Sequence, residues 1–200
     1  MNDTTLPVNE IFHSLQGEGY NTGTVAVFLR LSGCNLRCRF CDTDHQHANH
    51  LTLGEITRII NQWPDAPLLV LTGGEPALWI NNRIIDTLKR DTHKTIAIET
   101  NGTRPLPDGI DWVTLSPKSA FPGGDLQPVV LERCDELKVV YTGQDLSQYD
   151  HIKAKHHFLQ PCYTGDPAQR QLNIDDTIRA VMANPRWRLS LQTHRILQIP

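Results

Sequence analysis

Three cysteines lie close together in the segment SGCNLRCRFCDT, where Cys34, Cys38 and Cys41 follow a C-x3-C-x2-C spacing. The chain has five cysteines, and an odd number with three clustered favours a metal site over a disulfide framework. One candidate is a structural zinc ion, for which His45 would complete a Cys3His set. The other is a four-iron cubane, in which three thiolates leave one iron open to a small molecule.

A second segment that could do chemistry, TGGEP from Thr72 to Pro76, follows the apolar run LLVL. Its glycines allow the backbone to approach a ligand closely. The cysteine segment also follows an apolar run, so both segments are expected at strand ends that face one pocket. This placement favours a redox cluster over a peripheral zinc site.

The elements that must position these loops can be read from the hydrophobic pattern. Apolar, β-branched runs predict strands at residues 25–31, 68–71, 95–99, 112–115, 136–140, 158–159 and 188–191. Helical spacing predicts helices at residues 52–63, 82–90 and 175–183, the first of which begins with a Thr52–Glu55 capping box.

Strands that alternate with helices indicate a parallel sheet with crossover helices. About three helices are too few for a complete eight-unit barrel. We therefore expect an α/β fold, a trimmed, TIM-like partial barrel of six or seven mainly parallel strands, in a single domain that spans residues 1–200.

Unusual residues follow most of the predicted strands. Besides the two segments above, the strand ends carry ETNG, SPK, QPC and LQTHR. Ligand sites in parallel α/β folds form at the carboxyl ends of the strands. We therefore expect these segments to converge on one face of the molecule.

The composition excludes several classes of protein. A formal net charge of −3 gives no overall basic field, so direct binding of nucleic acid is not expected. The first residues, MNDTTLPVNE, have no basic and apolar regions of a signal peptide, and no apolar run reaches the length of a membrane span. A cytoplasmic protein without membrane contact is expected.

The segment CNLRCRFC, with the aromatic Phe40 before its last cysteine, resembles the cluster motif of radical S-adenosylmethionine (SAM) enzymes, and LTGGEP resembles their SAM-binding strand end. The resemblance becomes narrower when the segments are taken in order. From Glu10 to Pro200, the segments EIFHSLQGEGYNTGTVAVFLRLSGCNLRC, CDTD, LTGGEP, ETNGT, LSPK, LQP and LSLQTHR resemble the 7-carboxy-7-deazaguanine synthase family of the queuosine pathway.

This resemblance implies a reaction. The substrate would be 6-carboxy-5,6,7,8-tetrahydropterin and the product 7-carboxy-7-deazaguanine, with loss of ammonia. A reduced [4Fe–4S] cluster, one per subunit, would cleave SAM to a 5′-deoxyadenosyl radical that abstracts hydrogen at C6, after which the ring contracts. The resemblance also implies Mg²⁺, a homodimer and a flavodoxin- or ferredoxin-type reductant.

The resemblance also assigns roles to residues of this chain. The cluster ligands would be Cys34, Cys38 and Cys41, and Thr43 would bind Mg²⁺. SAM would contact Phe40, Cys41, Asp42, Gly73, Gly74, Glu75, Glu99, Ser116, Pro117, Lys118, Gln160, Pro161 and Cys162. The pterin would contact Leu15, Gln16, Gly17, Glu18, Arg30, Thr72, His194 and the terminal carboxylate of Pro200.

Several of these roles agree with the chemistry of the residues. A pterin edge offers N–H donors, which a carboxylate such as Glu18 can accept. Arg30, in the otherwise apolar VAVFLRL, is a bidentate partner for the substrate carboxylate. A hydroxyl such as that of Thr43 suits a hard cation such as Mg²⁺. The simpler alternatives are an edge-strand charge for Arg30, a turn residue for Glu18, a loop cap for Thr43 and a strand-end histidine for His194.

Two other functions compete with this interpretation. A glycyl-radical-enzyme activase has the same cysteine spacing on a short barrel, although SLQGEG and QTHR favour a small pterin-like substrate. A non-catalytic Cys3His zinc-binding module would explain the cysteines but not TGGEP, ETNG and SPK at the strand ends.

Overall fold

The computed structural model of the chain describes residues 4–38, 41, 47–119 and 127–200. The described strands are β1 (Thr5–Leu15), β2 (Val25–Leu31), β3 (Asn49–Thr52), β4 (Leu68–Gly73), β5 (Thr95–Thr100), β6 (Trp112–Leu115), β7 (Arg133–Tyr141), β8 (Lys153–Pro161) and β9 (Arg188–Leu189). The helices are α1 (Leu53–Ile60), α2 (Asn82–Thr92), α3 (Pro167–Ala183) and α4 (Thr193–Leu197), with 3₁₀ turns at Pro76–Leu78 and Leu146–Tyr149.

All the described strands belong to one sheet in the order β3-β1-β2-β4-β5-β6-β7-β8-β9. From β2 through β4 to β9, each strand pairs in parallel with the next, whereas β1 pairs antiparallel with β2 and with β3. The edges β3 and β9 stay apart in this order, so the sheet is an open, partial barrel. The expected α/β fold with mainly parallel strands is confirmed, and β1 and β3 are additional to the predicted strands.

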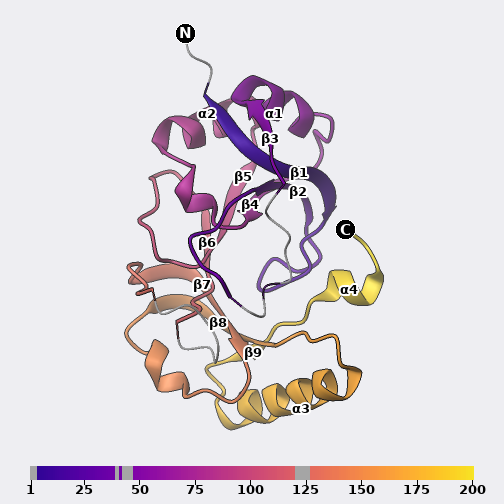
Figure 1. The fold of residues 1–200 in the computed structure, drawn as a ribbon, viewed down its shortest axis with the longest axis vertical. Helices are drawn as coiled ribbons and strands as arrows, with labels where there is room; N and C mark the ends of the chain where they lie inside the picture. Colours follow the sequence, from indigo (N-terminus) through magenta and orange to yellow (C-terminus); the bar gives the residue numbers. More distant parts are fainter. Residues whose placement is uncertain (1–3, 39–40, 42–46, 120–126) are drawn as a thin grey trace.

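The helices cover the two ends of the sheet, α1 and α2 beside β1 to β5 and α3 beside β8 and β9 (Figure 1). The predicted capping box is present, since the Thr52 side chain accepts from Glu55 N and the Glu55 carboxylate accepts from Thr52 N. Helix α3 begins eight residues before its expected start, at Pro167, after the N-cap Asp166. Proline at the first helical position is favoured because its missing N–H would have no partner there.

The outer face of the sheet holds most of the hydrophobic core. Alternate residues of β2, β4 and β5, such as Leu29, Leu69 and Ile98, pack against Ile56 and Ile60 of α1 and against α2. A second cluster joins β6, β7 and β8 to α3 through residues that include Leu137, Leu159 and Ala180. No described helix is both long and apolar enough to span a bilayer.

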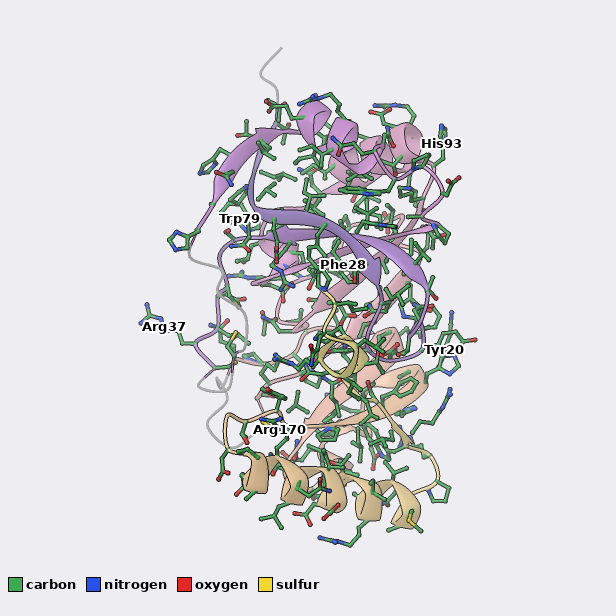
Figure 2. All side chains as sticks on the ribbon, turned by 90° about the vertical axis from the view of Figure 1, so that its right-hand side faces the viewer. Tyr20, Phe28, Arg37, Trp79, His93 and Arg170 are labelled. Atoms are coloured by element: carbon green, nitrogen blue, oxygen red, sulfur yellow. The ribbon has the colours of Figure 1, made fainter. Side chains whose placement is uncertain are left out.

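The inner face of the sheet is apolar only toward the amino ends of the strands. There Ala26, Phe28, Leu68, Val70 and Ala97 form a small buried cluster, which Phe12 and Trp112 adjoin. Figure 2 shows Phe28 in the interior of the molecule. Toward the carboxyl ends, the same face carries Arg30, Thr72, Glu99, Lys138 and Gln160, because side chains alternate along a strand. The apolar cluster thus forms the floor of a polar site.

Candidate active site

A cavity of about 1140 Å³ lies at the carboxyl ends of the parallel strands. Most of the expected site residues line it, although they come from segments between Leu15 and Pro200 in the chain. They are Leu15, Gln16, Gly17, Glu18, Arg30, Cys34, Cys38, Cys41, Thr72, Gly73, Gly74, Glu99, Ser116, Lys118, Gln160, Pro161, Cys162, His194 and Pro200. The convergence of the strand-end segments is therefore present in the structure.

The three cysteines Cys34, Cys38 and Cys41 all face this cavity. The Cys34 thiol accepts from Leu36 N at 3.4 Å, and its burial raises its pKa. Among the described residues, no three His, Cys, Asp or Glu side chains come close enough together to hold a single metal ion. A cubane has no such requirement, because each of its thiolates binds a different iron atom. The cysteine arrangement thus fits a cluster with a small molecule beside it in the cavity.

A polar network holds the cysteine loop against the rest of the site. The Asn35 side chain donates to Thr103 Oγ1 and to Gln127 Oε1, both at 2.8 Å. Asn101 Nδ2 donates to Asn35 Oδ1 at 3.2 Å, and Gln127 Nε2 donates to the Asn35 carbonyl at 2.9 Å. The loop between the first two cysteines is therefore bonded to the end of β5 and to the segment that precedes β7.

The glycines of TGGEP allow two strand ends to meet. A Cβ atom on Gly73, whose φ is +123°, would lie 2.0 Å from the Leu31 carbonyl oxygen. A Cβ atom on Gly74 would lie 2.0 Å from the Gly33 carbonyl oxygen. In place of such contacts, Gly74 N donates to Leu31 O at 3.0 Å, which brings the TGGEP backbone beside the cysteine loop.

Two expected SAM contacts, Glu75 and Pro117, do not line this cavity. Glu75 is fully buried, and its carboxylate accepts from Ala77 N, Thr100 Oγ1 and Asn101 N at 2.7–3.0 Å. Pro117 lines a separate cavity of about 360 Å³. The neighbours of Pro117, Ser116 and Lys118, face the main cavity, because consecutive residues of an extended segment point in opposite directions.

A buried ion-pair group lines the cavity. Lys138 Nζ donates to Glu18 Oε2 at 2.6 Å and to Glu99 Oε2 at 2.9 Å, and the lysine side chain is 5% exposed. Gln192 Nε2 donates to Glu18 Oε1 at 2.9 Å, and Gln16 Nε2 donates to Glu99 Oε1 at 3.3 Å. We call Glu18, Glu99 and Lys138 the central ion-pair group.

The pKa values of the two carboxylates in this group shift in opposite directions. Burial would raise the pKa of Glu18, but the charge and hydrogen bond of Lys138, with help from Gln192, lower that pKa to about 2. Burial raises the pKa of Glu99, and the negative charge of Glu18 adds to this effect against the attraction of Lys138. Lys138 loses hydration on burial, yet its acidic neighbours hold its pKa above the usual value.

A third acid, Glu136, lies on the same face of β7 below Lys138 and is 2% exposed. Its Oε2 accepts from Tyr20 N at 2.9 Å, whereas Oε1 has no hydrogen-bond partner in the described structure. Burial is the main cause that raises the pKa of Glu136 to about 7. Burial thus shifts the titration of the Glu136 carboxyl toward neutral pH.

The remaining substrate candidates lie around this group. Arg30 Nε donates to Glu10 Oε1 at 2.7 Å, and the two side chains are 23% and 50% exposed. Such a half-exposed pair orients the guanidinium at low energetic cost. His194 packs so closely against Gly17 that a Cβ atom on Gly17 would lie 2.4 Å from His194 Nδ1. Ser14 Oγ donates to the main-chain oxygen of Pro200 at 2.8 Å.

Three expected site residues, Phe40, Asp42 and Thr43, lie outside the described residues, as does His45 of the zinc alternative. Sequence reasoning also missed several residues that line the cavity, among them Lys138 and Gln192. A signal for Lys138 was available, because a lysine interrupts the apolar strand ELKVV in the way that Arg30 interrupts VAVFLRL. Gln192 stood within LQTHR and carried no distinguishing pattern of its own.

The sheet and the cysteine-lined cavity define a class of enzyme. The profile of the radical SAM superfamily matches residues 29–137, which run from β2 to β7 and include all three clustered cysteines. This class uses an iron–sulfur cluster together with SAM.

Comparison with individual proteins narrows the class. The chain is 52% identical to the 7-carboxy-7-deazaguanine synthase of Bacteroides thetaiotaomicron, over 96% of this chain and 97% of that protein. It is 37% identical to the enzyme of the same name from Bordetella pertussis, over 96% of this chain and 98% of that one. The crystal structure of QueE from Escherichia coli superposes with a TM-score of 0.74 at 28% identity, covering 94% of this chain and 93% of that one. The chain belongs to the 7-carboxy-7-deazaguanine synthase family of the radical SAM superfamily.

Proposed function

We propose that this protein converts 6-carboxy-5,6,7,8-tetrahydropterin to 7-carboxy-7-deazaguanine with loss of ammonia. One observation carries the proposal: the three cysteines, the TGGEP backbone, Arg30 and the central ion-pair group all line one cavity. The particular reaction is supported by the 52% identity to a 7-carboxy-7-deazaguanine synthase over nearly the whole of both chains.

The cysteine side of the cavity would hold the cofactors. Bound and reduced, the [4Fe–4S] cluster would cleave SAM and so supply the radical that abstracts hydrogen at substrate C6. Cys34, Cys38 and Cys41 would hold the cluster. The cavity-lining residues of β4, β6 and β8 ends would hold SAM, namely Gly73, Gly74, Ser116, Lys118, Gln160, Pro161 and Cys162. We also propose that Phe40 and Asp42 contact SAM. Glu75, which does not line the cavity, would stabilise the TGGEP segment through its buried hydrogen bonds.

The other side of the cavity would hold the pterin. Glu18 and Glu99 are carboxylates that can accept hydrogen bonds from ring N–H groups, whereas Arg30 can pair with the substrate carboxylate. Glu99, which the sequence assigned to SAM, shares Lys138 with Glu18, and this contact supports a role at the pterin end instead. Gln16, Gly17, Leu15, Thr72, His194 and Pro200 would complete the pocket.

The floor of the cavity would protect the reaction from water. The inner cluster around Phe28 and Val70 closes the barrel at the amino ends of the strands. A reactive intermediate therefore meets packed side chains on this side.

Other parts of the assignment are also proposals. We propose that Thr43 binds Mg²⁺ through its hydroxyl, that residues 1–200 form one radical SAM domain, and that the enzyme is a homodimer. Electrons would come from a flavodoxin or ferredoxin. Arg37, which precedes Cys38 in the chain, is exposed and projects from the molecule (Figure 2), and this cation supports a negatively charged donor. A cytoplasmic location suits a low-potential cluster, which an oxidising compartment would destroy.

The proposed function is tested by an anaerobic assay with a reconstituted and reduced cluster, SAM, Mg²⁺ and the pterin, followed by mass spectrometry. We expect 7-carboxy-7-deazaguanine, lost in Cys38→Ala but kept in Cys134→Ala, since Cys134 does not line the cavity. Cleavage of SAM to 5′-deoxyadenosine without this product would keep the class and overturn the substrate. One zinc per chain, without iron, sulfide or SAM cleavage, would overturn the proposal altogether.

A further inference from the structure

We propose that Lys138 is a positioning residue for the pterin, which holds the Glu18 and Glu99 carboxylates side by side so that both can accept N–H groups of the substrate. This inference rests on the proposed function and deepens it. Lys138 lies on β7, an interior strand of the sheet, while Glu18 and Glu99 come from the loop after β1 and from β5.

The contacts around Lys138 form a closed ring. Lys138 joins Glu18 to Glu99, the Gln16 amide joins Glu99 back to the start of the loop, and Glu18 N donates to Gln16 Oε1 at 3.1 Å. Gln192 fixes the second oxygen of Glu18 from the segment after β9. Every member of the ring faces the cavity, so the ring presents its carboxylates to whatever the cavity holds.

The charges in the ring explain why a cation is required at this position. Both carboxylates contact a single nitrogen atom, and Glu136 approaches from below on the same strand. Without the ammonium group, the carboxylates would repel one another across a buried space. One of them would move away or bind a proton, and a protonated carboxyl loses part of its capacity to accept N–H groups. The other titratable groups that act on these carboxylates are Lys118 and His194.

A purely structural role for Lys138 is the alternative, and the chain offers a matched control. Lys94 is also buried, at 5% exposure, and donates to the Trp63 and Ala66 carbonyls at 2.7 Å. It does not line the cavity. Lys94→Met therefore removes a buried ammonium without changing the site.

The experiment compares wild-type holoenzyme with Lys138→Met, Lys138→Arg and Lys94→Met. We measure the Kd of the pterin by calorimetry, the KM for pterin and for SAM, and thermal stability. For Lys138→Met we expect a rise of at least 30-fold in Kd and KM for the pterin, with KM for SAM changed less than threefold. Lys138→Arg should recover at least a third of the lost affinity, and Lys94→Met should lower Tm while the pterin Kd stays within twofold of wild type.

A double variant separates positioning from folding. Lys138→Met with Glu99→Gln removes one positive and one negative charge, so it should recover the Tm lost in Lys138→Met but not the pterin affinity. Recovery of both, or a Lys138→Met protein that binds the pterin as wild type does, would overturn the inference while the proposed function stands. Wild-type holoenzyme that neither binds nor converts the pterin would overturn the proposed function and this inference with it.

Discussion

At the scale of single residues, the site depends on a contact that only glycine permits. Because a Cβ atom on Gly17 would lie 2.4 Å from His194 Nδ1, Gly17→Ala must displace the imidazole or the loop. We expect a loss of at least tenfold in kcat/KM for the pterin, mainly through KM, with Tm lowered by only a few degrees. Steady-state kinetics and a thermal melt measure both quantities.

The control for this variant is Gly165→Ala, because a Cβ atom there meets nothing within 4 Å. It should keep wild-type kinetics. If Gly17→Ala also keeps wild-type kinetics, His194 can move without loss of activity. His194 would then have no part in substrate binding.

A second residue-scale prediction concerns pH. The pKa of Glu136 rises from its usual 4.5 to about 7 in the folded protein. Between these two values the folded state binds more protons than the unfolded state, so this residue lowers the free energy of unfolding as pH increases from 4.5 to 7. A shift of this size corresponds to about 3 kcal/mol, fully developed above pH 7.

Glu136→Gln removes this titration while its amide oxygen can still accept from Tyr20 N. We expect the variant to gain up to about 3 kcal/mol relative to wild type at pH 8 and to gain little at pH 4.5. Urea denaturation of both proteins across this range tests the prediction. Two parallel curves of unfolding free energy against pH would show that Glu136 has an ordinary pKa.

At the scale of elements, Glu75 connects the carboxyl ends of β4 and β5. Its carboxylate accepts from Thr100 Oγ1 and Asn101 N of the β5 end and from Ala77 N of its own turn. Glu75→Ala would leave these buried donors without a partner, so we expect a loss of at least about 2 kcal/mol in unfolding free energy. The affinity for SAM should fall as well, because Gly74 lies next to Glu75.

Chemical denaturation and SAM binding by calorimetry test this prediction, with the exposed Glu132→Ala as the control. If Glu75→Ala loses stability but binds SAM as wild type does, SAM binding at the β4 end does not depend on the hydrogen bonds of Glu75. Glu75 would then be a residue of the fold alone.

The elements also show what the sequence could and could not foretell. The seven parallel strands were predictable because most of them contain a short apolar run, whereas β1 was missed because its polar residues, such as Asn9, Glu10 and His13, alternate irregularly with apolar ones. Strand β3 has four residues, none of them fully buried, and α4 has five residues and no buried one. Such elements form through tertiary contacts, so local pattern carries little information about them.

The site was predictable in its segments and less so in its contacts. The strand-end motifs predicted most of the lining residues but not the direction of each side chain. Pro117, for example, lines a different cavity. The ion pairs of Lys138 join residues 39 and 120 positions apart in the sequence. Such contacts depend on how the assembled sheet and the loop after β1 come together.

At the scale of the whole molecule, the sheet separates stability from chemistry by its two faces. Leu69 lies fully buried on the outer face, among side chains of α1 and α2, and does not line the cavity. We expect Leu69→Ala to lower the free energy of unfolding by about 2–5 kcal/mol and to leave KM for the pterin and for SAM within twofold of wild type.

Denaturation and kinetics below the unfolding transition test this separation, with Met182→Ala, 77% exposed, as the control for the loss of side-chain volume. A Leu69→Ala protein with a tenfold higher KM would mean that the outer core also sets the geometry of the cavity. The control should match wild type in both measurements.

The hydrogen bonds that join the loop after β1 to the segment after β9 have a consequence for biosynthesis. Thr193 N donates to Gly17 O, Gly19 N donates to Ser190 Oγ and Gln192 donates to Glu18, across 171 to 176 residues of chain. A ribosome makes residue 17 long before residue 193, since 176 positions separate them, so the substrate end of the cavity stays incomplete until the later segment emerges. Contacts of such long range form late because they close a very large loop of the chain. The substrate end of the cavity is therefore completed only after all the intervening strands have been synthesised.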